Sequence, residues 1–102
     1  MKTITKKALM AKLGNFVSVE NTESRNGYGQ APNQFEIRFE NGRVFQSYQS
    51  LVAANIHGQL YFSGYHDYSN TTSRHCGQWC GYSTKERRDG LEKERFILII
   101  DE

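Results

Sequence analysis

Hydrophobic and polar residues alternate most regularly in the segment Gln34–Glu40 (QFEIRFE). Successive side chains of a β-strand point to opposite faces, so Phe35, Ile37 and Phe39 would share one face and the charged residues would occupy the other. This alternation is typical of a strand with one buried face. We therefore expect a strand here that packs its three apolar side chains onto a core.

The dipeptide Asn41-Gly42 follows this strand directly. A type I′ turn needs positive φ at both central positions, and Asn-Gly is among the dipeptides that favour it most. The sequence therefore predicts a two-residue hairpin turn at Asn41-Gly42. The resulting register pairs Glu40 with Arg43, Phe39 with Val44, Ile37 with Gln46 and Phe35 with Tyr48.

Further stretches predict more strands of the same sheet. Gln49–Ala54 and Gln59–Ser63 would form a second hairpin that turns near His57-Gly58. Asn15–Glu20 (NFVSVE) is another strand candidate. The run Phe96–Ile100 (FILII) shows no alternation, which indicates a strand that is covered on both faces.

The N-terminal segment Thr3–Leu13 has the features of a helix. Either Thr3 or Thr5 could cap its start, and Gly14 stands where a glycine commonly ends a helix. Four lysines precede the first acidic residue: Lys2, Lys6, Lys7 and Lys12. Such a basic end favours nucleic acid or an acidic protein as a partner, and lysines are equally typical of a solvated helix face.

Two more helix starts follow the second hairpin. Ser69 could cap a helix that runs through Cys80 and ends at Gly81. Ser83 and Glu86 have the spacing of a capping box, in which each side chain accepts a hydrogen bond from the other residue's backbone amide. Together the elements predict an α+β fold: a single small domain over residues 1–102, with one mostly antiparallel sheet and two or three short helices.

Asn21–Asn33 (NTESRNGYGQAPN) is predicted to be a surface loop, because it contains two glycines, the only proline and few apolar residues. Long loops in compact domains are often functional. Arg25 and Tyr28 are the candidate contact residues of this loop.

Net charge and targeting signals exclude few classes of function. The net charge of +2 is too small to imply a class of partner. The N-terminus shows no apolar signal-peptide core, and the longest apolar run, Phe96–Ile100, is far shorter than the roughly 20 residues that span a bilayer. We therefore expect a soluble, cytoplasmic protein with no membrane partner.

Cys76 and Cys80 could belong to a metal site or to a thiol enzyme. Their spacing would put both thiols on one side of a helix, but His75 would point about 100° away, and zinc needs three or four protein ligands. A nucleophilic cysteine would need an oriented base, and His66 and Asp67 would point to opposite faces of a strand. We expect no metal, no cofactor and no catalytic residue, and we keep a Cys/His metal-dependent or thiol enzyme as the last alternative.

The segment Tyr61–Arg88 interleaves aromatic rings with cations. Tyr, Trp and Arg are enriched in protein interfaces, and the same residue types stack on bases and hold phosphates. The candidate partner-binding residues are Tyr65, His66, Tyr68, Arg74, His75, Trp79, Arg87 and Arg88. No catalytic motif accompanies them, so we expect a binding protein and not an enzyme, with a small nucleic-acid-binding domain as the alternative.

Two stretches, Asp67–Gly81 (DYSNTTSRHCGQWCG) and Phe35–Ala53 (FEIRFENGRVFQSYQSLVA), resemble a family of small uncharacterised proteins of tailed phages and mobile elements. The resemblance covers Gln34 to Ile100, and the family has no known activity. It implies a phage-type protein of the host cytoplasm that inhibits or redirects a host macromolecular machine. The expected partner is a host protein or ribonucleoprotein, such as a nuclease or an RNA-guided defence complex (an anti-CRISPR-like role), with direct RNA or DNA contact through basic residues as a variant.

Overall fold

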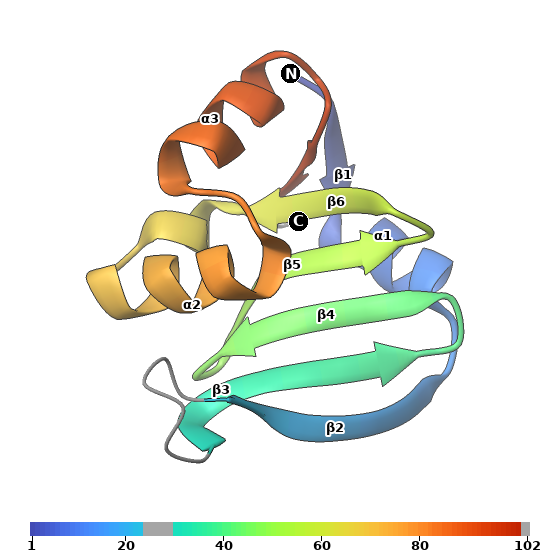
Figure 1. The fold of residues 1–102 in the computed structure, drawn as a ribbon. Coiled ribbons are helices and arrows are strands. Elements are labelled where there is room, and N and C mark those ends of the chain that lie inside the picture. Colours follow the sequence, from blue (N-terminus) through green and yellow to red (C-terminus); the bar gives the residue numbers. More distant parts are fainter. Residues whose placement is uncertain (24–29, 101–102) are drawn as a thin grey trace.

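The computed structural model describes residues 1–23 and 30–100. Within these residues, seven strands form one sheet with the order β1-β7-β6-β5-β4-β3-β2 (Figure 1). The strands are β1 (Thr3–Thr5), β2 (Phe16–Glu23), β3 (Gln30–Phe39), β4 (Gly42–Ser47), β5 (Ser50–Ile56), β6 (Gln59–Ser63) and β7 (Ile97–Ile100). The helices are α1 (Lys6–Leu13), η1 (Gly64–Asp67, a 3₁₀ turn), α2 (Asn70–Cys80) and α3 (Thr84–Glu92). The pairs β1–β7 and β6–β7 are parallel and the others antiparallel, which confirms the predicted fold class.

Helices cover both faces of the sheet, with α1 on one face and α2 and α3 on the other (Figure 1). The cluster under α2 and α3 consists of Phe45, Val52, Ala53, Leu60, Phe62, Cys76, Leu91 and Phe96. The cluster under α1 consists of Leu9, Leu13, Val44, Ala54, Ile56, Tyr61 and Ile99. The central strands supply both clusters, which is why their apolar residues run consecutively. No helix in the described part of the chain is long and apolar enough to cross a membrane.

The second predicted hairpin is confirmed. His57 and Gly58 connect β5 to β6 and both have positive φ, 51° and 88°. The side chain of Asn55 stabilises this turn, because its Oδ1 accepts a hydrogen bond from the backbone amide of Gly58 at 3.0 Å. The strands on either side then pair from Ile56 with Gln59 onward.

The predicted ends of the later helices are confirmed as well. The hydroxyl of Ser69 accepts a hydrogen bond from the backbone amide of Thr72 in the first turn of α2, and Gly81 ends this helix in the left-handed conformation (φ 84°). Ser83 and Glu86 form both hydrogen bonds of the capping box at the start of α3. These contacts are local in sequence, so residue types alone specified them.

The predicted register of the first hairpin is wrong. Phe39 pairs with Gly42 and Ile37 with Val44, so the connecting residues are Glu40 and Asn41. Backbone hydrogen bonds connect both residues to the C-terminal end of α1 and the residues just after it. The amide of Glu40 donates to the carbonyl of Asn15 and that of Asn41 to the carbonyl of Leu13, each at 3.0 Å. These tertiary hydrogen bonds override the local preference of Asn-Gly for a type I′ turn.

The predicted N-terminal helix starts later than expected. Thr3–Thr5 form β1, which pairs in parallel with β7, and Thr5 caps α1 by accepting a hydrogen bond from the amide of Ala8 at 3.0 Å. The pairing with β7 competes with helix formation for these residues, and Thr is a good strand former. Gly14 ends the helix as predicted, with φ 79°.

The predicted loop Asn21–Asn33 is wrong at both ends. β2 runs through Glu23 and β3 starts at Gln30, and these two residues pair with each other. The antiparallel neighbours β2 and β3 pair through their backbones, so polar side chains do not prevent the strand. The proposed contact residues Arg25 and Tyr28 lie outside the described residues.

Candidate functional site: a tyrosine surface above a buried arginine

The residues predicted to bind a partner do not form one surface. Four of them are exposed (Tyr65, Tyr68, Arg74 and Arg88), two are half-buried (His75 and Trp79), and two are buried (His66 and Arg87). The exposed tyrosines and the buried pair nevertheless meet at one place, the short turn η1 between β6 and α2.

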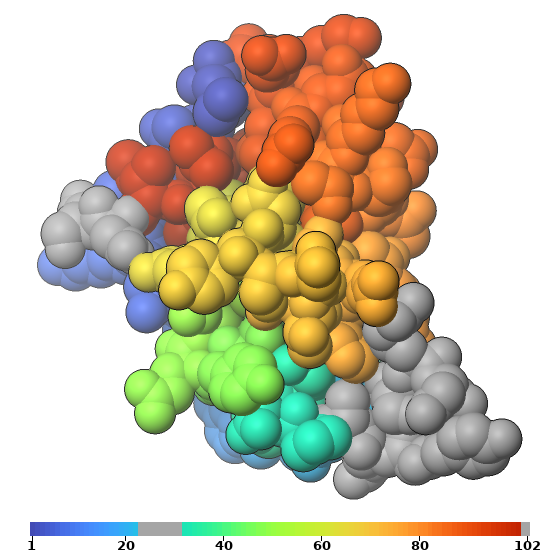
Figure 2. Space-filling model, turned by 90° about the vertical axis from the view of Figure 1, so that its left-hand side faces the viewer, coloured from blue at the N-terminus to red at the C-terminus, as the bar shows by residue number. Residues whose placement is uncertain are grey.

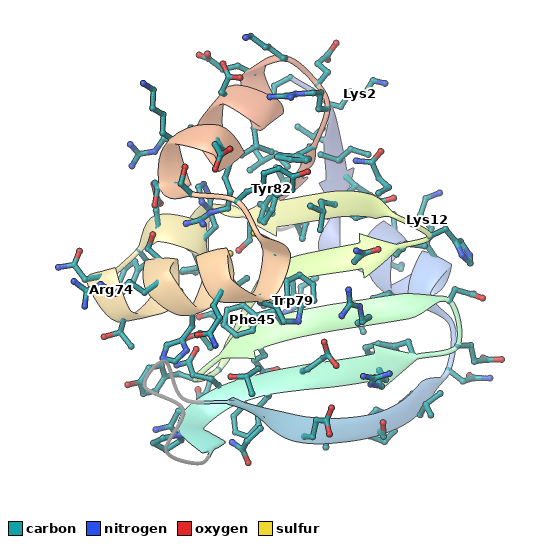
Figure 3. All side chains as sticks on the ribbon, in the orientation of Figure 1. Lys2, Lys12, Phe45, Arg74, Trp79 and Tyr82 are labelled. Atoms are coloured by element: carbon teal, nitrogen blue, oxygen red, sulfur yellow. The ribbon has the colours of Figure 1, made fainter. Side chains whose placement is uncertain are left out.

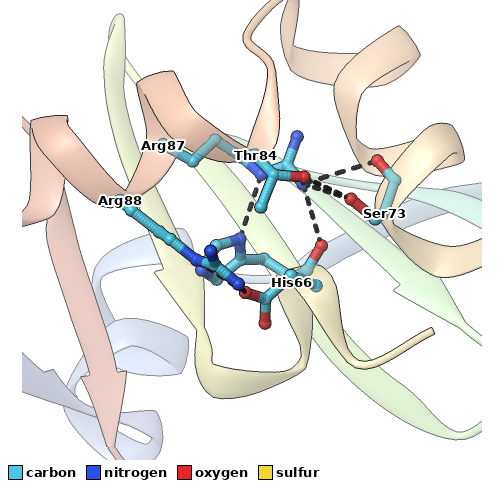
Figure 4. Close-up of polar contacts among 6 residues, drawn as sticks. His66, Ser73, Thr84, Arg87 and Arg88 are labelled. Atoms are coloured by element: carbon cyan, nitrogen blue, oxygen red, sulfur yellow. Dashed lines mark hydrogen bonds and ion pairs between the residues drawn. The ribbon is translucent and has the colours of Figure 1, made fainter. Parts of the chain in front are cut away.

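Burial removes His66 and Arg87 from the predicted partner surface. The exposed fraction of Arg87 is 0%, and its guanidinium reaches from α3 into the space between η1 and α2 (Figure 4). Nε donates to Nδ1 of His66 at 3.0 Å, and Nη1 donates to the carbonyl of Tyr82 at 2.6 Å. Nη2 donates to the carbonyl of His66 and to the hydroxyls of Ser73 and Thr84. Arg87 therefore joins η1, α2 and the chain that leads from α2 into α3.

The partners of Arg87 are neutral, and none of the ion pairs among the described residues includes it. Burial lowers the pKa of His66, and the nearby Arg87 guanidinium lowers it further against the opposing effect of Asp67. His66 is thus neutral and accepts at Nδ1. A buried charge without a carboxylate is costly unless its hydrogen bonds are satisfied, and here each of the three guanidinium nitrogens donates at least one.

The neighbouring Arg88 holds the same turn from outside. Its Nε donates to Oδ2 of Asp67 at 3.0 Å, and Nη2 forms an ion pair with the same oxygen. Burial alone would raise the pKa of Asp67, but the hydrogen bond from Arg88, together with smaller effects of nearby positive charge and of the backbone, lowers it overall. Two consecutive arginines of α3 therefore fix η1, Arg87 from inside and Arg88 from the surface.

Trp79 attaches α2 to the sheet and is not free to contact a partner with its whole ring. The ring stacks on Phe45 with centroids 5.9 Å apart (Figure 3), and Nε1 donates to Glu36 at 2.9 Å. The guanidinium of Arg43 also lies over the ring, 5.3 Å from its centroid. Trp79 thus belongs to the packing between α2, β3 and β4.

Three exposed tyrosines surround a hollow next to η1. Tyr65 and Tyr68 lie edge to face with ring centroids 6.0 Å apart, and they are 42% and 79% exposed. Tyr48, 57% exposed, comes from the turn between β4 and β5. Figure 2 shows η1 and the start of α2, in yellow and gold, directly above this turn, in green. The hollow has a volume of about 170 Å³ and is lined by Ser47, Tyr48, Ser50, Val52, Tyr65, Tyr68 and Thr72. We call these three tyrosines and this hollow the tyrosine surface.

The backbone of Tyr48 is held in an uncommon conformation. Its φ is 55°, a region that bulky residues rarely adopt. Its amide donates to the carbonyl of Asn33 at 2.6 Å, and the side chain of Gln46 donates to its carbonyl at 2.8 Å. The sequence does not indicate Tyr48 as a site residue, because the predicted hairpin register puts Tyr48 in a strand opposite Phe35. The polar break Ser47–Ser50 between two apolar runs was the signal for a turn here.

Hydroxyl groups join the elements around the hollow. Oγ of Ser47, at the end of β4, lies 3.1 Å from Oγ1 of Thr72 on α2, and Ser69 donates to the same Thr72 oxygen at 3.2 Å. Ser63 donates to the carbonyl of Leu51 at 2.7 Å, which ties the start of η1 to β5. The tyrosine surface is therefore assembled on a hydrogen-bonded support.

The lining of the hollow carries no carboxylate, histidine or cysteine. Within residues 1–23 and 30–100, no group of three or more His, Cys, Asp or Glu side chains is placed to hold a metal ion. Cys76 and Cys80 are free thiols on α2. The tyrosine surface consists of aromatic rings and hydroxyls above an apolar floor. This combination is suited to binding an uncharged group.

These contacts define a small α+β domain whose exposed tyrosines rest on a buried arginine network. A family model described as a family of unknown function, DUF8033, matches residues 2–97, and the chain belongs to this family. No curated protein matches the chain, and no solved structure matches it. The family description names no source and no activity, so the phage origin implied by the resemblance stays a prediction.

Proposed function

We propose that this protein is a non-enzymatic binding protein that recognises another protein through the tyrosine surface. The observation that carries the proposal is the convergence of Tyr48, Tyr65 and Tyr68 around one hollow, from two turns separated in the sequence. Tyrosine is among the residues that dominate binding energy at interfaces, because it brings a large contact area on few rotatable bonds.

The chemistry of the hollow favours a protein over a nucleic acid. None of its lining residues carries a charge, whereas nucleic-acid binding depends on cations that neutralise phosphates. The nearby cation Arg88 is already paired with Asp67. A hollow of about 170 Å³ fits a single apolar side chain of a partner, with the tyrosine hydroxyls available to its backbone.

The support beneath the surface favours tight binding. Arg87 and Arg88 fix η1, and the hydroxyls of Ser47 and Thr72 join β4 to α2, so the tyrosine-bearing turns are ordered before a partner arrives. A preorganised surface loses less conformational entropy on association. We further propose, on the resemblance described above, that the partner is part of a host macromolecular machine whose action the protein inhibits or redirects.

Affinity capture of partners from a lysate of the source cells tests this proposal with Tyr68→Ala. We expect a protein that the wild type retains and that Tyr68→Ala retains at least tenfold less well, because truncation of a tyrosine that is an interface hot spot costs about 2 kcal/mol or more. Val17→Ala is the matched control: Val17 is 60% exposed and follows Phe16, which pairs with Phe39 at the other end of the sheet. Retention that is unchanged by Tyr68→Ala would refute the surface, and retention that nuclease treatment abolishes would indicate nucleic acid.

Replacing Tyr48 by glycine is expected to separate binding from stability. The left-handed backbone costs an ordinary residue about 1 kcal/mol, and the extra freedom of unfolded glycine costs 0.5–1 kcal/mol, so the two effects nearly cancel. We therefore expect Tyr48→Gly to change the free energy of unfolding by less than about 1 kcal/mol and to weaken partner binding at least tenfold. His57→Gly is the control, because His57 has the same backbone conformation (φ 51°) and is exposed in the turn between β5 and β6. Equal loss of binding in both variants would contradict the prediction.

A further inference from the structure

A second hollow adjoins the tyrosine surface and contains a lysine. It has a volume of about 160 Å³ and is lined by Lys6, Gln49, Ser50, Leu51, Ser63, Gly64, Tyr65 and Ile99. Ser50 and Tyr65 line the hollow of the tyrosine surface as well, so the two hollows meet at these side chains. We call the second one the lysine hollow.

The order of the strands brings Lys6 to this place. Thr5, the last residue of β1, pairs with Ile100 of β7. The neighbouring Ile99 pairs with Ser63, the last residue of β6. α1 starts directly after Thr5 and η1 directly after Ser63, so Lys6 lies at the same edge of the sheet as the turn that carries Tyr65.

The lysine hollow has a positive potential. Lys6 is the only charged residue among the described residues of its lining. The side chain is exposed, and within residues 1–23 and 30–100 it takes part in no ion pair. Lys6 is also the first residue of α1, whose first turn contains no acidic residue. The helix dipole favours an anion at this end, so it adds to the effect of the ammonium group.

The other polar side chains of the lining differ in their availability. The hydroxyl of Ser63 donates to the carbonyl of Leu51 at 2.7 Å and accepts from the amide of Tyr65 at 3.2 Å, so it holds the wall of the hollow. Gln49 and Ser50 add an amide and a hydroxyl to the lining. Such donors beside an ammonium group suit the oxygens of a carboxylate. The hollow of the tyrosine surface, in contrast, has an uncharged lining.

We propose that the partner binds as an extended segment, with an apolar side chain in the hollow of the tyrosine surface and an aspartate or glutamate two residues away in the lysine hollow. This inference rests on the proposed function and adds the chemistry of the segment that is bound. Alternate side chains of an extended chain point to one face about 7 Å apart, which is enough to span the ring of Tyr65. The carboxylate opposite Lys6 then selects the partner and its register.

Selection from a library of random peptides, displayed as internal segments between fixed flanks, tests this assignment. From the wild type we expect an enriched pattern with a large apolar residue and an acidic residue two positions apart. Lys6→Gln should enrich the apolar residue without the acidic one. Lys7→Gln is the matched control, because it removes the same charge from the next residue of α1, which does not line the hollow, and it should enrich the wild-type pattern. An apolar pattern without an acidic residue from the wild type, or an acidic preference that persists in Lys6→Gln, would overturn the inference.

Tyr68→Ala distinguishes a failure of this inference from a failure of the proposed function. Peptides selected by the wild type should bind this variant at least tenfold less well. A selection that enriches no pattern, or peptides that bind Tyr68→Ala as well as the wild type, would refute both proposals. Binding that depends on Tyr68 but not on Lys6 would refute the inference alone. Asp101 and Glu102 lie outside the described residues, and a chain that lacks them should enrich the same pattern; loss of the acidic residue from that pattern would also refute the inference.

A selected peptide then measures the contact with Lys6 directly. Replacing its acidic residue by the corresponding amide should weaken binding to the wild type about fivefold at low ionic strength, the upper range for an exposed ion pair. The same replacement should leave the affinity for Lys6→Gln unchanged, and high salt should reduce the difference between the two proteins. Lys6 is exposed, so its substitution leaves the fold intact. Equal losses of affinity in the wild type and in Lys6→Gln would show that the carboxylate does not contact Lys6.

Discussion

Replacing Arg87 by methionine is expected to lower the free energy of unfolding by about 3 to 5 kcal/mol, because it leaves several buried hydrogen-bond acceptors without a donor. Methionine fills a similar volume but donates no hydrogen bond. It would leave the carbonyls of His66 and Tyr82 and the Nδ1 of His66 without the donors they have now. Each unsatisfied buried acceptor costs roughly 1 to 3 kcal/mol, which accounts for the size of the effect.

Arg88→Met is the matched control for this experiment. Arg88 is the next residue of α3, but its side chain is 66% exposed and its pair with Asp67 is at the surface. Exposed ion pairs contribute between about 0 and 1 kcal/mol, so we expect Arg88→Met to change stability by less than about 1 kcal/mol. Urea unfolding curves of the three proteins measure the difference. A loss of less than about 1 kcal/mol in Arg87→Met would show that the network does not hold η1 to the helices.

Arg87→Lys separates charge from geometry. Lysine keeps the positive charge but has one nitrogen in place of the planar fork, so it cannot reach η1, α2 and the carbonyl of Tyr82 together. We expect it to be nearly as destabilising as methionine. Because Arg87 supports the turn that carries Tyr65 and Tyr68, both variants should also weaken partner binding beyond what unfolding explains.

The position of Arg87 shows what the sequence could not reveal. The capping residues Ser69 and Ser83 were identified correctly because a cap depends on residues within three positions. The sequence predicts Arg87 as a partner-binding residue because arginine is enriched in protein interfaces and stands here among aromatic residues. Its acceptors lie on three segments that only the fold brings together, and no local pattern indicates them.

The tyrosine surface was partly predictable. Tyr65 and Tyr68 follow the end of a recognised strand, and their aromatic character marked them as candidate contact residues. Tyr48 was missed because its assignment depended on the hairpin register, which was wrong. When a turn is misplaced by one residue, the residues beyond the paired strands are assigned wrongly. Tyr48 was therefore assigned to a strand, although its ring is one of the three around the hollow.

The register error also leads to the second large prediction, that Gly42→Ala lowers the free energy of unfolding by about 2 to 3 kcal/mol. Gly42 lies in β4 opposite Ile56, and a Cβ at this position would overlap the carbonyl oxygen of Asn55 and lie 3.1 Å from Cγ1 of Ile56. Because the overlapping atom belongs to the backbone of β5, it can move away only if the pairing of β4 with β5 is distorted. The glycine is thus needed for close approach of two strands and not for positive φ.

Gly64→Ala serves as the control for Gly42→Ala, since a Cβ at Gly64 would meet no heavy atom within 4 Å. We expect this variant to stay within about 0.5 kcal/mol of the wild type, as surface substitutions usually do. Urea unfolding again measures both. If Gly42→Ala were as stable as Gly64→Ala, the close approach of Gly42 to the backbone of β5 would be refuted. A turn at Asn41-Gly42 would not explain such a result, because it would place Gly42 at positive φ, where alanine is also destabilising. The contacts of Asn41 argue against that turn, because its side chain donates to the carbonyl of Lys12 at 3.1 Å and fixes this end of the hairpin to α1.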